Sequence, residues 1–122
     1  MKSREDIKRE YRERQKPAGI FCIKNISSGR LLLGSSLNLE GVLNRHKFML
    51  SINQHPNKKL QHDWNEQGPD KFIYETLEVI EVKEEAGFNI NDELTLLEQI
   101  WIEKLNPFGE KGYNINQNIR QV

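Results

Sequence analysis

The hydrophobic positions of this chain follow two different periods, and the changes of period mark the predicted elements. Dense runs of β-branched and aromatic residues predict strands at residues 18–25, 30–34 and 71–82. Apolar side chains that recur every three or four positions predict helices at residues 39–51, 56–67 and 92–105. A polar segment over 3–15, with Ser3 and Asp6 spaced as a capping box, predicts one more helix.

Turn and cap signals join these elements into one fold class. Gly29 favours a hairpin turn between the first two strands, and Asn38 favours the start of the helix at 39–51. Asn91 or Asp92 is expected to cap the helix that ends near residue 105. The order predicts an α+β domain, built on a small, mainly antiparallel three-stranded sheet flanked by helices. We expect a charged arm at 1–17, the domain at 18–116 and a tail at 117–122.

Composition narrows the class of protein. With 122 residues, 36% of them hydrophobic and 30% charged, the chain suits a single globular domain. No apolar run approaches the roughly 20 residues that span a bilayer, and the start of the chain is charged. We therefore expect no membrane association and a cytoplasmic location. Cys22 lies within a strand-like run, where a buried apolar role is expected.

Charge is unevenly distributed although the net charge is zero. Residues 1–60 carry thirteen lysines and arginines and five acidic residues, a net charge of +8, and the remainder carries −8. Such asymmetry is a hint of nucleic-acid binding, but folding can interleave the two halves.

One carboxylate stands out on the last predicted helix. Glu98 lies on the same face as Leu94 and Trp101, and a core-facing carboxylate is costly unless it is paired, hydrogen-bonded or metal-bound. A structural partner is the common explanation, and a metal ligand or general base is the functional one. Among the histidines, His46 lies on an apolar helix face, whereas His55 and His62 have the sequence surroundings of exposed residues.

Several short motifs, in this order, resemble the GIY-YIG nuclease family. The resemblance covers roughly residues 18–116 and rests on Gly19-Ile20-Phe21, Leu32-Leu33-Gly34, the helix at 39–47, Gly68 to Phe72, Leu96 to Pro107 and Gly112-Tyr113-Asn114-Ile115. It implies that family's fold, DNA as partner, and cleavage assisted by one divalent metal, Mg²⁺. Carried over by position, Glu98 is the metal carboxylate, Asn114 a polar residue near the site, and His46 a histidine one turn after the family's arginine.

The same resemblance shows where the chain departs from the family. Phe21 and Leu32 stand at the positions of the two motif tyrosines, and Val42 stands at the position of the helix arginine. None of these three side chains can donate a proton or carry charge. Arg45 lies three residues after Val42, about 60° around the helix, and is either a replacement for that arginine or a surface contact. Tyr74 and Tyr113 are the tyrosines that could replace a lost hydroxyl.

Three functions follow from this pattern. The leading interpretation is a non-enzymatic nucleic-acid-binding module on a nuclease fold, in which phosphate is contacted by Ser35, Ser36, Arg45 and Lys47. The alternative is an active Mg²⁺-dependent DNA endonuclease with a rearranged site of Glu98, Arg45 and His46. A protein-interaction domain without a nucleic-acid role is the third.

Overall fold

The computed structural model describes residues 3–7, 16–81 and 83–115. In chain order the elements are β1 (Gly19–Asn25), β2 (Leu31–Ser36), α2 (Leu39–Ser51), α3 (Lys58–Gln67), the 3₁₀ helix η1 (Pro69–Lys71), β3 (Phe72–Val79), α4 (Ile90–Leu105) and the 3₁₀ helix η2 (Gly109–Lys111). At the N-terminus, Ser3 and Asp6 form the reciprocal bonds of a capping box, while residues 8–15 of that predicted helix lie outside the described residues. No helix in the described ranges is long and apolar enough to span a membrane.

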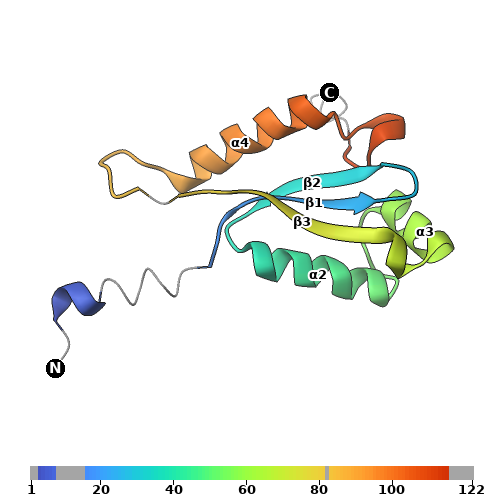
Figure 1. Cartoon of the computed structure of the whole chain (residues 1–122), viewed down its shortest axis with the longest axis horizontal. Helices are drawn as coiled ribbons and strands as arrows, with labels where there is room; N and C mark the ends of the chain where they lie inside the picture. Colours follow the sequence, from blue (N-terminus) through green and yellow to red (C-terminus); the bar gives the residue numbers. More distant parts are fainter. Residues whose placement is uncertain (1–2, 8–15, 82, 116–122) are drawn as a thin grey trace.

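The three strands form one antiparallel sheet in the order β2-β1-β3, which confirms the predicted fold class. Helix α4 covers one face of the sheet, and α2 and α3 lie on the other (Figure 1). Each face has its own apolar core. Ile20 and Leu33 of the sheet pack against Ile102 of α4, whereas the opposite core consists of Ile23, Leu50, Leu60, Phe72 and Tyr113.

Two glycines of the sheet are required by close approach of neighbouring atoms. A Cβ at Gly19 would overlap the carbonyl oxygen of Glu78 on β3. A Cβ at Gly34 would lie 2.7 Å from the ring of Phe21, its partner across the β1–β2 ladder. A backbone that must pass this close to another strand or ring accepts only glycine.

The outer edge of β2 is covered by the closing segment of the chain. The side-chain amide of Asn114 accepts from the backbone N–H of Leu33 at 2.8 Å and donates to the carbonyl of the same residue at 2.9 Å. The backbone N–H of Tyr113 donates to the Leu31 carbonyl. Because β2 is an edge strand, these bonds satisfy polar groups that would otherwise face solvent or another chain.

Several expectations about local structure were wrong in detail, among them the end of β3, which lies at Val79 rather than at residue 82. The cap of α4 is Asn89, whose side chain accepts from the N–H groups of Asn91 and Asp92, so those two residues lie inside the helix. Helix α3 begins at Lys58, capped by Asn57, two residues later than expected. His55 is not exposed: only 2% of its surface is accessible.

Candidate functional site

Glu98 occupies the place on α4 that the sequence predicts, on the side facing the sheet. Leu94 and Ile102, one turn before and one turn after it, are both buried. The Glu98 carboxylate is partly buried and accepts a hydrogen bond from the Ser35 hydroxyl of β2 at 2.8 Å. A neutral hydroxyl, rather than an arginine, therefore stabilises this carboxylate among the described residues.

A cavity of about 250 Å³ opens beside Glu98 at the edge of β2. Leu32, Asn57 and Asn114 are among its other lining residues. Phe21 and Val42 do not line it, so Leu32 is the one of the three replaced positions that lies at the cavity beside Glu98. Asn57 and Asn114 already use their side-chain amides in protein hydrogen bonds. Glu98 is thus the charged group of this cavity.

The α2 side of the sheet brings together residues that the sequence did not connect. His46 Nδ1 lies 2.7 Å from His55 Nε2, and the two rings stack with their centroids 5.0 Å apart. The ring of Phe21 contacts the other side of His46, with 5.4 Å between centroids. His55, which its sequence surroundings predict to be exposed, is therefore buried in this contact. No signal near His55 in the sequence could have placed it there, because its neighbour is nine residues away.

Burial and neighbouring charge keep the two histidines neutral. Burial lowers the pKa of His46 to about 4, and repulsion from a protonated His55 and from Arg45 acts in the same direction. Burial likewise lowers the pKa of His55. At neutral pH this pair therefore carries no positive charge.

The four predicted phosphate contacts differ in their exposure and in whether their side chains already bind another residue. Arg45 and Lys47 are exposed on α2, and the Lys47 ammonium lies 4.8 Å from the centre of the Tyr74 ring. The Ser36 hydroxyl is engaged with the backbone of Asn38, at the turn into α2. Ser35 is engaged with Glu98. Among these four side chains, Arg45 is therefore the one that is exposed and available to bind a ligand.

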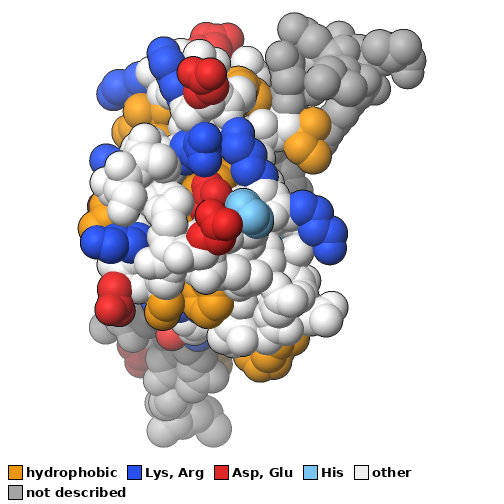
Figure 2. All heavy atoms as spheres, turned by 90° about the vertical axis from the view of Figure 1, so that its right-hand side faces the viewer, with side chains coloured by type: hydrophobic (Ala, Val, Ile, Leu, Met, Phe, Trp, Pro, Cys, Tyr) orange, Lys and Arg blue, Asp and Glu red, His pale blue; other side chains and the backbone are white. Residues whose placement is uncertain are grey.

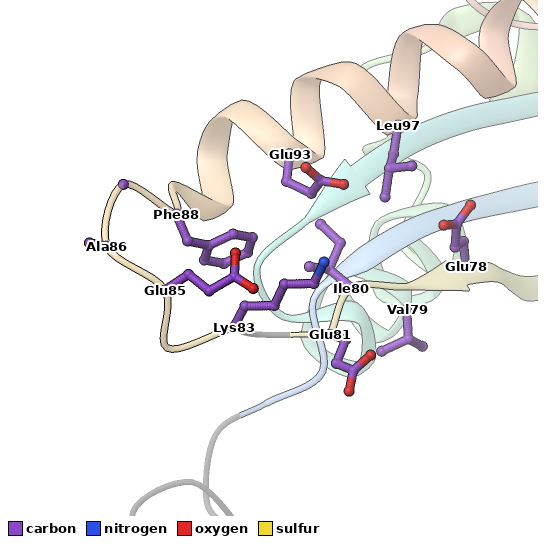
Figure 3. Close-up of a pocket in the computed structure, with 11 residues that line it drawn as sticks. Glu78, Val79, Ile80, Glu81, Lys83, Glu85, Ala86, Phe88, Glu93 and Leu97 are labelled. Atoms are coloured by element: carbon purple, nitrogen blue, oxygen red, sulfur yellow. The ribbon is translucent and has the colours of Figure 1, made fainter.

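A second cavity, of about 440 Å³, lies between the end of β3, the loop at 83–88 and the start of α4. Figure 3 shows Lys83 and Phe88 extending into it, with Glu93 and Leu97 approaching from α4. Its lining contains four glutamates and one lysine. This excess of negative charge opposes a phosphate ligand. This second cavity therefore differs in both position and charge from the cavity beside Glu98.

Comparison with known proteins gives one consistent match. The catalytic domain of intron endonuclease I-TevI, as a mutant with one glutamate replaced by alanine, superposes with a TM-score of 0.66 and 30% sequence identity. That match covers 82% of this chain and 94% of that domain. Another structure of the catalytic domain of homing endonuclease I-TevI gives a TM-score of 0.64 and 32% identity, covering 81% of this chain and 98% of that one. No family model and no curated protein sequence matches the chain.

Proposed function

The chain belongs to the GIY-YIG nuclease family, and we propose that it acts as a DNA-binding module in which the family's cleavage chemistry is degenerate. DNA is proposed as the partner because the similar structures are named as homing and intron endonucleases. The match extends over nearly the whole of that catalytic domain. The fold that presents DNA to a nuclease site is therefore retained.

The observation that carries the proposal is the position of Phe21. Phe21 is 4% exposed, and its ring lies against His46 and fills the space above Gly34, so no oxygen reaches the site from the first motif. Leu32 packs against the apolar core below α2. Each removed acid–base or charge-stabilising group typically costs two or more orders of magnitude in rate.

The described tyrosines do not replace the lost hydroxyls. The Tyr113 hydroxyl donates to Asp63 at 2.8 Å and accepts from Asn25 at 3.1 Å, within a buried network. Its pKa is raised to about 12, chiefly by burial, so it remains protonated at neutral pH. Tyr74 packs against the same core and lies under Lys47. Neither residue lines the cavity beside Glu98.

The residues present fit a divalent metal that arrives together with DNA. Within the described residues no three histidine, cysteine or acidic side chains gather as a metal cluster. Glu98, oriented by Ser35, would supply one carboxylate, which suffices for Mg²⁺ only when phosphates and waters complete the shell. A bound Mg²⁺ polarises a phosphate and stabilises the leaving oxygen. Arg45, exposed on α2, would contribute to holding the DNA phosphate.

A second candidate function is an active endonuclease with a rearranged site. The contact between His46 and His55 favours it, because the pair adds a polar group beside Phe21. In that function Glu98 would hold the metal, Arg45 would bind phosphate, and His46 would act in proton transfer.

Nicking of supercoiled plasmid in Mg²⁺ or Mn²⁺ distinguishes the two functions. The proposed module binds DNA in a salt-sensitive manner and shows little or no nicking. Multiple-turnover nicking that disappears in both Glu98→Ala and Arg45→Ala would establish the rearranged enzyme instead. Lys104→Ala, on α4 beside Trp101, is the control for removal of a surface cation.

A further inference from the structure

The two histidines on the α2 side of the sheet are held in place by the backbone that follows them. The backbone N–H of Asn57 donates to His55 Nδ1 at 3.0 Å, and His55 Nε2 lies 2.7 Å from His46 Nδ1. The backbone N–H of His55 donates to the side-chain oxygen of Gln61 on α3. We refer to His46 and His55 as the histidine pair.

These contacts determine where the protons of the histidine pair reside. A backbone N–H can only donate, so His55 Nδ1 must be an acceptor and the neutral His55 ring carries its proton on Nε2. That proton is then donated to His46 Nδ1, and the neutral His46 ring must carry its own proton on Nε2. Both acceptor nitrogens of the pair are thus occupied. A further proton can enter only by breaking one of the two hydrogen bonds.

The charged groups around His46 also oppose its protonation. Burial contributes most to the lowered pKa of His46. Repulsion from a protonated His55, in the loop before α3, and from Arg45 on α2 lowers this pKa further. From β1 it meets the uncharged ring of Phe21. No carboxylate forms an ion pair with it among the described residues. The neutral state that the hydrogen bonds require is therefore the state that the surroundings favour.

The free nitrogen of the pair, His46 Nε2, is open to a ligand. It has no protein hydrogen-bond partner among the described residues. It is also not a buried atom left without a partner, because Gln67 Oε1 is the one side-chain atom of that kind in the described part of the chain. The His46 side chain is itself partly exposed on α2. Arg45, the adjacent residue on the same helix, is exposed. An N–H donor and a guanidinium are thus presented by neighbouring residues of α2.

We propose that the histidine pair binds a phosphodiester of nucleic acid through His46 Nε2–H, which donates to a non-bridging phosphate oxygen while both rings remain neutral. His55 is a positioning residue, because it fixes the tautomer of His46 without touching the phosphate. This role rests on the proposed DNA-binding function and argues against His46 as a general base, since its only free nitrogen already carries a proton. It accords with binding that does not lead to cleavage.

The tautomers can be measured on the full chain without any substitution. Long-range ¹H–¹⁵N correlation spectra at pH 7 are expected to show Nε2–H for both members of the pair. The spectra should remain unchanged on acidification to about pH 5.5. His62, an exposed histidine whose Nε2 lies 3.4 Å from a Glu66 carboxylate oxygen, is the internal reference for these spectra. A proton on His46 Nδ1, or titration of His46 near pH 6.5, would overturn the proposal.

Binding of short duplex DNA tests the contact itself. His46→Ala is expected to weaken binding about tenfold, the usual effect of losing one hydrogen bond to a charged group, to the same extent from pH 5.5 to pH 8. His55→Gln keeps a donor for His46 and an acceptor for the Asn57 N–H, so affinity should be preserved. His55→Leu removes the donor and frees His46 Nδ1, and affinity should then increase as the pH falls below about 6.5. His62→Ala is the control.

The outcomes separate this inference from the function on which it rests. Failure of the unmodified chain to bind DNA would overturn both. DNA binding that is unchanged in a folded His46→Ala variant would overturn the phosphate contact and leave the proposed function intact. The folded state of each variant is checked by circular dichroism, and His55→Gln provides a result even where His55→Leu does not fold.

Discussion

The ring of Phe21 lies against Gly34 and His46, so a hydroxyl added to it would enter the space between β2 and α2. At the scale of single residues, the absence of this hydroxyl is the clearest difference between the site and one that can carry out acid–base chemistry. Leu32 and Val42 differ in the same way, because neither carries a polar atom. Glu98 does carry a carboxylate, which accepts a hydrogen bond from Ser35, so the proposed metal position is less altered than the proposed proton-transfer positions.

Restoring the missing groups together should restore cleavage. We expect the triple substitution Phe21→Tyr/Leu32→Tyr/Val42→Arg to raise Mg²⁺-dependent plasmid nicking at least about 100-fold, whereas Phe21→Tyr alone stays near the unmodified chain. Groups that act in one step are not additive, which is why one hydroxyl is insufficient. Adding Glu98→Ala to the triple variant should abolish the gain. A folded triple variant without nicking would show that the replaced residues are not what limits the reaction.

The histidine pair also predicts a pH dependence of stability. The pKa of His46 is lowered to about 4 in the folded state, so between pH 6.5 and pH 4 the unfolded chain binds a proton that the folded chain does not. The free energy of unfolding should therefore decrease as the pH falls through this range, on the order of 2 kcal/mol from His46. Urea unfolding at pH 7.0 and pH 4.5 measures it. His46→Gln should lose less stability than the unmodified chain over the same interval, and an equal loss would contradict the assignment.

At the scale of elements, the sequence predicts well what depends on local period and poorly what depends on distant partners. Helix α2 runs over Leu39–Ser51 as its apolar spacing and Asn38 indicate. The cap of α4 was misplaced because Asn89, Asn91 and Asp92 are all good capping residues. Local sequence does not distinguish among them.

The site shows the same limit. The face of α4 that carries Glu98 was predictable from the spacing of its leucines, but Ser35 is 63 residues away in the chain. His55 has the turn-like surroundings of an exposed loop residue, with Pro56 following it. The burial of His55 results from contacts with α2 and α3, and the residues next to it in the sequence do not predict these contacts.

The closing segment depends on one buried carboxylate of α3. Asp63 accepts from Arg30 at 2.9 Å and from the Tyr113 hydroxyl at 2.8 Å. We expect Asp63→Ala to lower the free energy of unfolding by about 3 kcal/mol, because it leaves two donors unpaired, and Tyr113→Phe by about 1 kcal/mol. Urea unfolding measures both. Glu66→Ala on the same helix breaks an exposed pair with His62 and should change stability by less than about 0.5 kcal/mol.

At the scale of the whole molecule, folding interleaves the charges that the sequence separates. Figure 2 shows lysines and arginines among carboxylates on the end of the molecule where α3 lies, rather than one continuous basic face. The Arg30–Asp63 pair joins the basic half of the chain to the acidic half. The acidic cavity at the opposite end of the sheet, beside the start of α4, should repel a polyanion. DNA is therefore expected to bind at the β2 and α2 side through few phosphate contacts.

Few contacts imply weak binding with a shallow salt dependence, and this can be measured residue by residue. The logarithm of the DNA association constant should fall linearly with the logarithm of salt concentration, with a slope of about −0.9 for each phosphate neutralised. Arg45→Gln should reduce the magnitude of that slope by about 0.9 and weaken binding to all sequences alike, since a phosphate contact carries no base information. Lys104→Gln, a cation of similar reach that lies over Trp101 on α4, should leave the slope unchanged. Equal effects of the two substitutions would show that DNA is held by overall charge, and would remove α2 as the binding surface.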